Sequence, residues 1–293
     1  MALAVAALVI TAGVVLLQNT RTIPLVSERC TASVDGVASE LDPAEAGYAA
    51  LITAVAVQRG LPARAATIAI ATAIQESGLR NLSFGDRDSL GLFQQRPSQG
   101  WGTAEQVVDP LYATNAFYDA LVAIEGYESM EITVASDLVQ RSAFPNAVAD
   151  HEPEGRAFAS ALTGNSPAAL VCRLRPVGDP PTAIVGESGL SAGAEAVVAT
   201  ATAEFGSVTS DPAPPSEGAS EGTAVTLALD AAADPERLAW SLAQWAVASA
   251  DRLDVVAVTV GGSTWRREDP DAAWADTDGA DSPGSVVVEV ASD

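Results

Sequence analysis

The feature that most constrains the fold is an alanine-rich apolar run from Ala65 to Ile74, which leads directly into Glu76 and Ser77. Such a run is typical of a buried helix, so Glu76 should lie at the helix end against apolar neighbours. Burial disfavours the charged form of a carboxyl group and raises its pKa, which is the environment of a general acid. The sequence therefore predicts a chemically unusual glutamate at a helix terminus.

Further helices are predicted around this one. Asp42, Pro43 and Glu45 form a helix start, because they combine an N-cap acid, a proline at the first position and an acid in the first turn. The predicted helices cover residues 42–58, 62–76, 109–124, 133–139 and 154–162, and a loop-rich stretch lies at 78–100. These elements predict a mainly α domain over residues 30–175.

Within the loop-rich stretch, Gly91-Leu92-Phe93-Gln94 begins fifteen residues after Glu76, and Pro97 follows. The Glu-Ser pair, the Gly-Leu-x-Gln segment at this spacing and the proline resemble the soluble lytic transglycosylases of the lysozyme-like superfamily. The resemblance covers residues 40–170. It implies a lysozyme-like fold that cleaves the MurNAc–GlcNAc bond of peptidoglycan glycan strands, with Glu76 as general acid and then base.

The resemblance also implies residues that bind the glycan. Ser77 would orient the glutamate, Gln94 and Gln95 would contact substrate, and Trp101 would offer a stacking surface for a sugar. A place for Trp101 in the core is the alternative reading. Residues 139–145 lack the tyrosine that the family often places near the cleft. A second function therefore stays open, a non-catalytic lysozyme-like protein that binds glycan or scaffolds the cell wall.

Other chemistry has less support in the sequence. Asp86 and Asp88 could reach the cleft as a second acid, or could shape their loop through Asx turns and a pair with Arg87. The amino-acid sequence of residues 87–97 is similar to that of actinobacterial exported proteins often labelled heavy-metal transporters. One histidine and two distant cysteines make no metal site, so we expect neither a metal nor another cofactor.

Charge and the N-terminus indicate where the protein acts. A net charge of −23 leaves no basic surface for nucleic acid, which excludes that class of partner. The apolar segment 2–17 is free of charge and somewhat shorter than the about 20 residues of a typical membrane span. The segment fits a signal peptide or a signal anchor, and we interpret residues 1–29 as an uncleaved signal anchor with a short stalk. The prediction is a single-pass protein of the cell membrane whose bulk lies outside the cytoplasm.

The two cysteines and the C-terminal composition predict the remaining organisation. Cys30 and Cys172 bracket the glutamate motif and are expected to form a disulfide, with two buried free thiols as the alternative. Residues 176–222, rich in Ala, Gly, Ser, Pro and Glu, are expected to be a flexible acidic linker. Residues 223–293, with strands expected at 223–229, 255–260 and 285–290 and a helix over 234–253, should form a small α/β domain, a candidate contact for a cell-wall protein. The predicted fold is thus a mainly α lysozyme-like domain plus a small C-terminal α/β domain.

Overall fold

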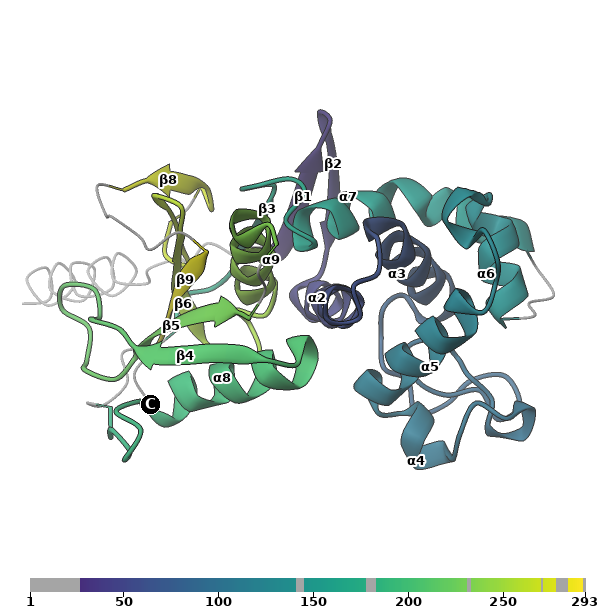
Figure 1. The fold of residues 1–293 in the computed structure, drawn as a ribbon, viewed down its shortest axis with the longest axis horizontal. Helices are drawn as coiled ribbons and strands as arrows, with labels where there is room; N and C mark the ends of the chain where they lie inside the picture. The colour runs from purple at the N-terminus through teal and green to yellow at the C-terminus, as the bar shows by residue number, and fades with distance from the viewer. Residues whose placement is uncertain are drawn as a thin grey trace, which may run out of the picture.

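The computed structural model describes residues 27–140, 145–177, 183–230, 233–269, 271–277 and 284–291 (Figure 1). Its α-helices in these residues are α2 (Pro43–Gln58), α3 (Ala63–Ser77), α4 (Ala104–Val107), α5 (Pro110–Val122), α6 (Ile132–Gln140), α7 (Glu152–Leu162), α8 (Ala192–Phe205) and α9 (Pro235–Ala248). Its strands are β1 (Arg29–Val34), β2 (Val37–Leu41), β3 (Leu170–Arg173), β4 (Val208–Pro212), β5 (Ala224–Leu229), β6 (Val255–Val260), β7 (Ser263–Arg266), β8 (Trp274–Asp276) and β9 (Ser285–Val290). Short 3-10 helices cover Pro97–Gln99, Tyr127–Ser129 and Pro145–His151. We call the described part of residues 27–177 the helical half and that of residues 183–291 the sheet half.

Helix α2 is the centre of the molecule. It begins as the sequence predicts, since the backbone N–H of Asp42 donates to Oε2 of Glu45 at 3.0 Å and Pro43 occupies the first turn. Every residue from Ala46 to Ala56 except Tyr48 is buried. A helix that is apolar on all sides is surrounded by protein. In agreement with this, α2 contacts α3, α5 and α7 of the helical half and α8 and α9 of the sheet half.

The prediction of a mainly α fold is wrong. The described residues hold two antiparallel sheets, one of three strands in the order β2-β1-β3 and one of six strands in the order β4-β5-β9-β6-β7-β8. The five predicted helices of the helical half are confirmed, but its sheet was missed. Strand β1 alternates polar and apolar residues, as Arg-Cys-Thr-Ala-Ser-Val, but its partner β3 lies far along the chain and shows no such alternation.

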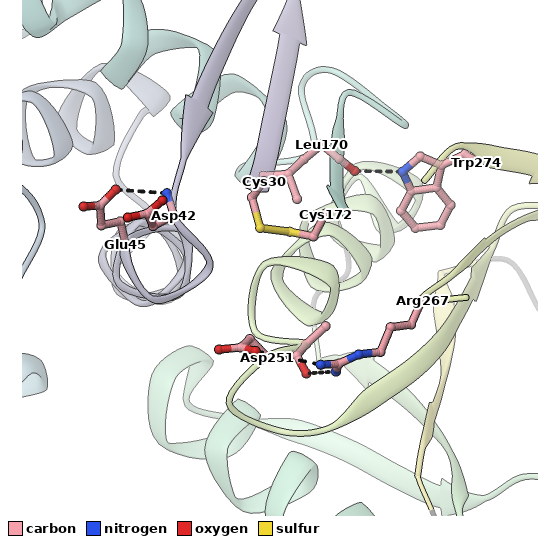
Figure 2. Close-up of a disulfide and its surroundings, with 9 residues drawn as sticks. Cys30, Asp42, Glu45, Leu170, Cys172, Asp251, Arg267 and Trp274 are labelled. Carbon is pink, nitrogen blue, oxygen red and sulfur yellow. Dashed lines mark hydrogen bonds and ion pairs between the residues drawn. A yellow bond between two sulfur atoms is a disulfide. The ribbon is translucent and has the colours of Figure 1, made fainter. Parts of the chain in front are cut away.

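The disulfide between Cys30 and Cys172 is confirmed. These residues are direct partners in the antiparallel pairing of β1 with β3, and both are buried. Figure 2 shows the bond beside Leu170, at the edge of the sheet half. The disulfide therefore joins the first and last strands of the helical half.

The prediction of a flexible linker over residues 176–222 is also wrong. Helix α8 and strand β4 lie in this stretch, and Ser191 caps α8 by accepting a hydrogen bond from the backbone N–H of Ala194 at 3.3 Å. Helices α8 and α9 both pack against β5 and β9. The ring of Trp245 on α9 meets that of Phe205 on α8 edge to face at 5.7 Å. The predicted strands at 223–229, 255–260 and 285–290 and the helix between them are confirmed.

The two halves share one hydrophobic core. The buried amide of Gln244 on α9 accepts a hydrogen bond from the backbone N–H of Leu170 at 2.8 Å and donates to the carbonyl oxygens of Ala161 at 2.6 Å and Ser166 at 3.1 Å. Indole Nε1 of Trp274 donates to the carbonyl of Leu170 at 2.9 Å (Figure 2). These bonds place the sheet half in a fixed position on the helical half.

Among the residues that the structure describes, no helix is long and apolar enough to cross a membrane. The predicted signal anchor falls mainly on residues 1–26, which lie outside the described part.

Candidate functional site

Glu76 occupies the last turn of α3, one residue before the helix ends at Ser77. The helix stops because Gly78 adopts a left-handed conformation with φ of 63°. Burial raises the pKa of the Glu76 carboxyl, and a hydrogen bond from the Gln140 side chain opposes this shift. Within the described residues no cation forms an ion pair with Glu76; the guanidinium of Arg80 instead donates to the carbonyl of Ser77 at 3.1 Å.

Ser77 fixes the loop opposite the glutamate. Its hydroxyl donates to the carbonyl of Leu92 at 2.7 Å and accepts from the backbone N–H of Arg80 at 3.2 Å. The side chain is buried, so these bonds are shielded from water. Ser77 therefore joins the end of α3 to the Gly-Leu-Phe-Gln segment, which brings the two parts of the predicted motif together.

The Gly-Leu-Phe-Gln segment is shaped by close packing. Gly91 has φ of 77°, and a Cβ at this position would lie 2.1 Å from the carbonyl oxygen of Val107, so only glycine fits. Phe93 is fully buried and stacks on Phe117, with ring centroids 4.6 Å apart. Phe93 thus belongs to the core under the site.

The two predicted glutamines use their side chains inside the loop. Nε2 of Gln94 donates to the carbonyls of Gly91 at 3.2 Å and Phe84 at 3.4 Å. A Cβ on Gly85 would lie 1.9 Å from the side-chain oxygen of Gln94, so this glycine makes room for it. Gln95 is only 1% exposed and donates to the carbonyl of Ala113 at 3.2 Å. In this structure Gln95 is a buried support of the loop.

Trp101 is half-buried and packs against the core. This placement agrees with the core alternative and leaves part of the indole accessible. Phe84, which the sequence did not single out, is 71% exposed on the same loop. An exposed large aromatic side chain often marks a contact surface.

Gln140 is the site residue that the sequence did not reveal. It is the last residue of α6, and its Nε2 donates to the carbonyl of Phe93 at 2.6 Å. The same side chain lowers the pKa of the Glu76 carboxyl, in opposition to the effect of burial. Gln140 lies in residues 139–145, where the lytic transglycosylases that this sequence resembles often have a tyrosine. Considering every polar side chain in that stretch, and not tyrosine alone, would have identified Gln140 from the sequence.

The two aspartates of the loop, the candidates for a second acid, differ in their contacts. Asp88 accepts hydrogen bonds from Nε of Arg96 at 2.8 Å and from the backbone N–H of Ser98 at 2.7 Å. The bonds from Ser98 and Arg96 hold the pKa of Asp88 far below its usual range. Asp86 is exposed, with one oxygen 3.9 Å from Nε of Arg87. Asp88 therefore shapes the loop, as the alternative interpretation predicts, but its ion-pair partner is Arg96 and not Arg87.

Four surface cavities of about 270 to 460 Å³ lie elsewhere, along α2, the start of α5 and both ends of α9, and Glu76 lines none of these four. In the described part of the chain no three His, Cys, Asp or Glu side chains are grouped so that they could hold a metal ion.

The site therefore consists of one half-buried carboxyl group, a loop fixed by Ser77 and an amide from α6. Comparison with protein-family models and with curated proteins finds no match to this chain.

Proposed function

We propose that the protein cleaves peptidoglycan glycan strands as a lytic transglycosylase, with Glu76 as its acid. The observation that carries the proposal is the Glu76 carboxyl, whose pKa is raised by burial and which has no cationic partner in the described part. Such a group keeps its proton closer to neutral pH and can give it to the oxygen of a glycosidic bond.

The reaction needs a single protein carboxyl group. Glu76 protonates the bridging oxygen while the bond from that oxygen to C1 of MurNAc breaks. The 6-hydroxyl of the same sugar then attacks C1 and returns its proton to Glu76, which gives a 1,6-anhydro product without consuming water. The ion pair and hydrogen bonds of Asp88 favour this route over hydrolysis with a second carboxylate.

An extracytoplasmic location fits the proposal. Disulfides persist in oxidising compartments, and the Cys30–Cys172 bond is buried between paired strands. We infer that the chain works outside the cytoplasm, held at the membrane by its N-terminal segment.

The test is digestion of purified peptidoglycan by the full-length protein beside a Glu76→Gln variant, with products identified by mass spectrometry. We expect 1,6-anhydro muropeptides from the wild type and a loss of about 100-fold or more in the variant, the usual size of a general-acid contribution. The raised pKa of Glu76 means that ionising this carboxyl group destabilises the folded protein. Its contribution to the free energy of unfolding is therefore present at low pH and is lost as the pH rises through the raised pKa. The variant should therefore be at least as stable as the wild type at pH 7, so lost activity is not lost fold.

Reducing-end products would contradict the transglycosylase route, and equal activity of the two proteins would exclude Glu76 as the acid. The second candidate, a glycan-binding protein without activity, is favoured by the inward-facing Gln95 and by the four cavities that lie away from Glu76. Retention of the protein on insoluble peptidoglycan with no soluble product would support this candidate.

Gln140 gives a second prediction about the same carboxyl group. Its hydrogen bond favours the ionised form of Glu76, so Gln140→Leu should raise the pKa of Glu76 further. The basic limb of the pH–activity profile should then move to higher pH, because the acid keeps its proton longer. Titration of the Glu76 carboxyl by ¹³C NMR gives a reading independent of activity. Gln75→Leu, an exposed neighbour on α3, is the matched control, and an unchanged or lowered pKa in Gln140→Leu would contradict the assigned role.

A further inference from the structure

The loop that follows α3 presents a large aromatic ring to solvent. Residues 83–87, which we call the loop tip, are all exposed, and Phe84 among them is 71% exposed. The base of the loop is closed, because the backbone N–H of Gly91 donates to the carbonyl of Leu82 at 2.7 Å. Single exposed apolar side chains are common on protein surfaces, so the exposure of Phe84 alone decides nothing. The way in which the loop tip is held is more informative.

The backbone under Phe84 is held by Gln94. Nε2 of Gln94 donates to the carbonyl of Phe84 at 3.4 Å and to that of Gly91 at 3.2 Å. Gly85 makes room for this side chain, because a Cβ on it would lie 1.9 Å from Oε1 of Gln94 and 2.7 Å from the carbonyl oxygen of Ser89. Gln94 itself has a φ of 48°, a conformation that side-chain-bearing residues seldom adopt. The loop tip therefore has a built support, which fixes where the ring is presented.

The same support joins the loop tip to the end of α3. The hydroxyl of Ser77, the neighbour of Glu76, donates to the carbonyl of Leu92 at 2.7 Å, and Gln94 follows two residues later. Two extended residues span about 7 Å, so the path through Gln94 puts the backbone of Phe84 within about 20 Å of that hydroxyl. A polymer bound at Glu76 covers such a distance with a few of its sugars.

The surroundings of Phe84 suit a sugar better than a protein partner. The other residues of the loop tip are polar or small, namely Ser83, Gly85, Asp86 and Arg87. A protein interface needs a contiguous apolar patch, whereas a pyranose needs one aromatic face for its C–H groups and polar side chains for its hydroxyls. The charges of Asp86 and Arg87 offset each other at 3.9 Å, so the loop tip fits an uncharged sugar.

We propose that Phe84 is a substrate-binding residue that stacks on an N-acetylated sugar of the glycan strand, at a distance from the bond that is cleaved, and that Gln94 is its positioning residue. The proposal rests on the proposed function, because the strand is the same peptidoglycan. Phe84 holds the strand equally in the ground state and in the transition state, since it lies away from the reacting atoms. Its loss should therefore raise KM and leave kcat unchanged.

The first test measures retention of the full-length protein on insoluble peptidoglycan. Every protein in it carries Glu76→Gln, so that no strand is cut during the assay. We expect Phe84→Ser to weaken retention about fivefold or more and Phe84→Trp to keep it, because an indole also offers an aromatic face. The matched control is Ile184→Ser, which removes an apolar side chain of the sheet half that is 86% exposed, and it should leave retention unchanged. Soluble N-acetylglucosamine oligomers should compete with retention of the Phe84 protein.

The second test uses proteins that keep Glu76. Phe84→Ser should raise the peptidoglycan concentration at half-maximal rate by a similar factor, with kcat unchanged. Gly85→Ala displaces the Gln94 side chain while Phe84 stays, and it should weaken retention with an unchanged circular dichroism spectrum.

The outcomes separate this proposal from the proposed function. Unchanged retention of Phe84→Ser, an equal loss in Ile184→Ser, or no competition by the sugar oligomers would overturn the role of Phe84, even where the wild type releases 1,6-anhydro products. Unchanged retention of Gly85→Ala would overturn the positioning role of Gln94. Weakened retention of Phe84→Ser with no soluble product from the wild type would support the glycan contact and contradict the enzyme.

Discussion

Replacing Cys30 and Cys172 together by alanine should lower the free energy of unfolding by about 5 kcal/mol. The bond closes a loop with a sequence separation of 142 residues. In the chain-entropy account, a cross-link over a loop of that length removes about 5 kcal/mol of conformational freedom from the unfolded chain. Both sulfur atoms are buried between β1 and β3, so small alanine side chains disturb few other contacts. Urea denaturation followed by circular dichroism measures the change.

The control for the disulfide is chemical. Wild-type protein treated with a thiol reductant should approach the stability of the double variant, and the double variant should not respond to the reductant. A loss below about 1 kcal/mol would mean that the two strands are held equally well without the cross-link, or that the unfolded chain remains compact.

The outcome for the fold shows which signals a single sequence carries. The helices of the helical half were predictable because their start signals are strong, as at Asp42 with Pro43, and because their buried runs are long. Helix α8 was missed although its buried residues recur at helical spacing; they are Ala194, Val197, Ala201, Glu204 and Phe205. Small side chains and a buried acid make a weak apolar stripe. In a segment rich in Gly, Ser and Pro, such a stripe is hard to distinguish from a linker.

The three-stranded sheet was missed for a different reason. Strand β1 pairs with β3 across the whole helical half, and the register is carried by partners such as Cys30 with Cys172. Local patterns do not contain pairings at this separation. The cysteine pair was the sequence signal for the pairing of β1 with β3, and it was used only to predict a bond and a domain boundary.

The candidate site was predictable where local geometry decides it. The apolar run placed Glu76 at a helix end, and the fifteen-residue spacing brought Leu92 to Ser77. The contribution of Gln140 was not predictable, because it depends on how α6 packs on the loop. The orientation of Gln95 was also out of reach, since a glutamine can face a cleft or bond a buried carbonyl with the same sequence around it.

The second large effect should come from Gln244, whose side-chain amide makes three hydrogen bonds across the junction of the two halves. Gln244→Leu keeps the volume of the side chain but leaves the backbone N–H of Leu170 and the carbonyl of Ser166 without a partner, whereas the carbonyl of Ala161 keeps a bond from a backbone N–H. Each buried polar group that loses its partner costs about 1–3 kcal/mol, so we expect a total loss of about 4 kcal/mol. Gln75→Leu on the exposed face of α3 should change stability by less than about 0.5 kcal/mol.

The Gln244 variant should also separate the unfolding of the two halves. Four of the five tryptophans lie in the sheet half, so fluorescence reports mainly on that half, whereas circular dichroism reports on helices of both. In the wild type one shared core should give coincident urea transitions by the two methods. In Gln244→Leu the fluorescence transition should come at lower urea concentration, because α9 has lost its bond to β3 and one of its bonds to the end of α7. Coincident transitions together with an unchanged free energy of unfolding would show that apolar packing alone holds the halves together.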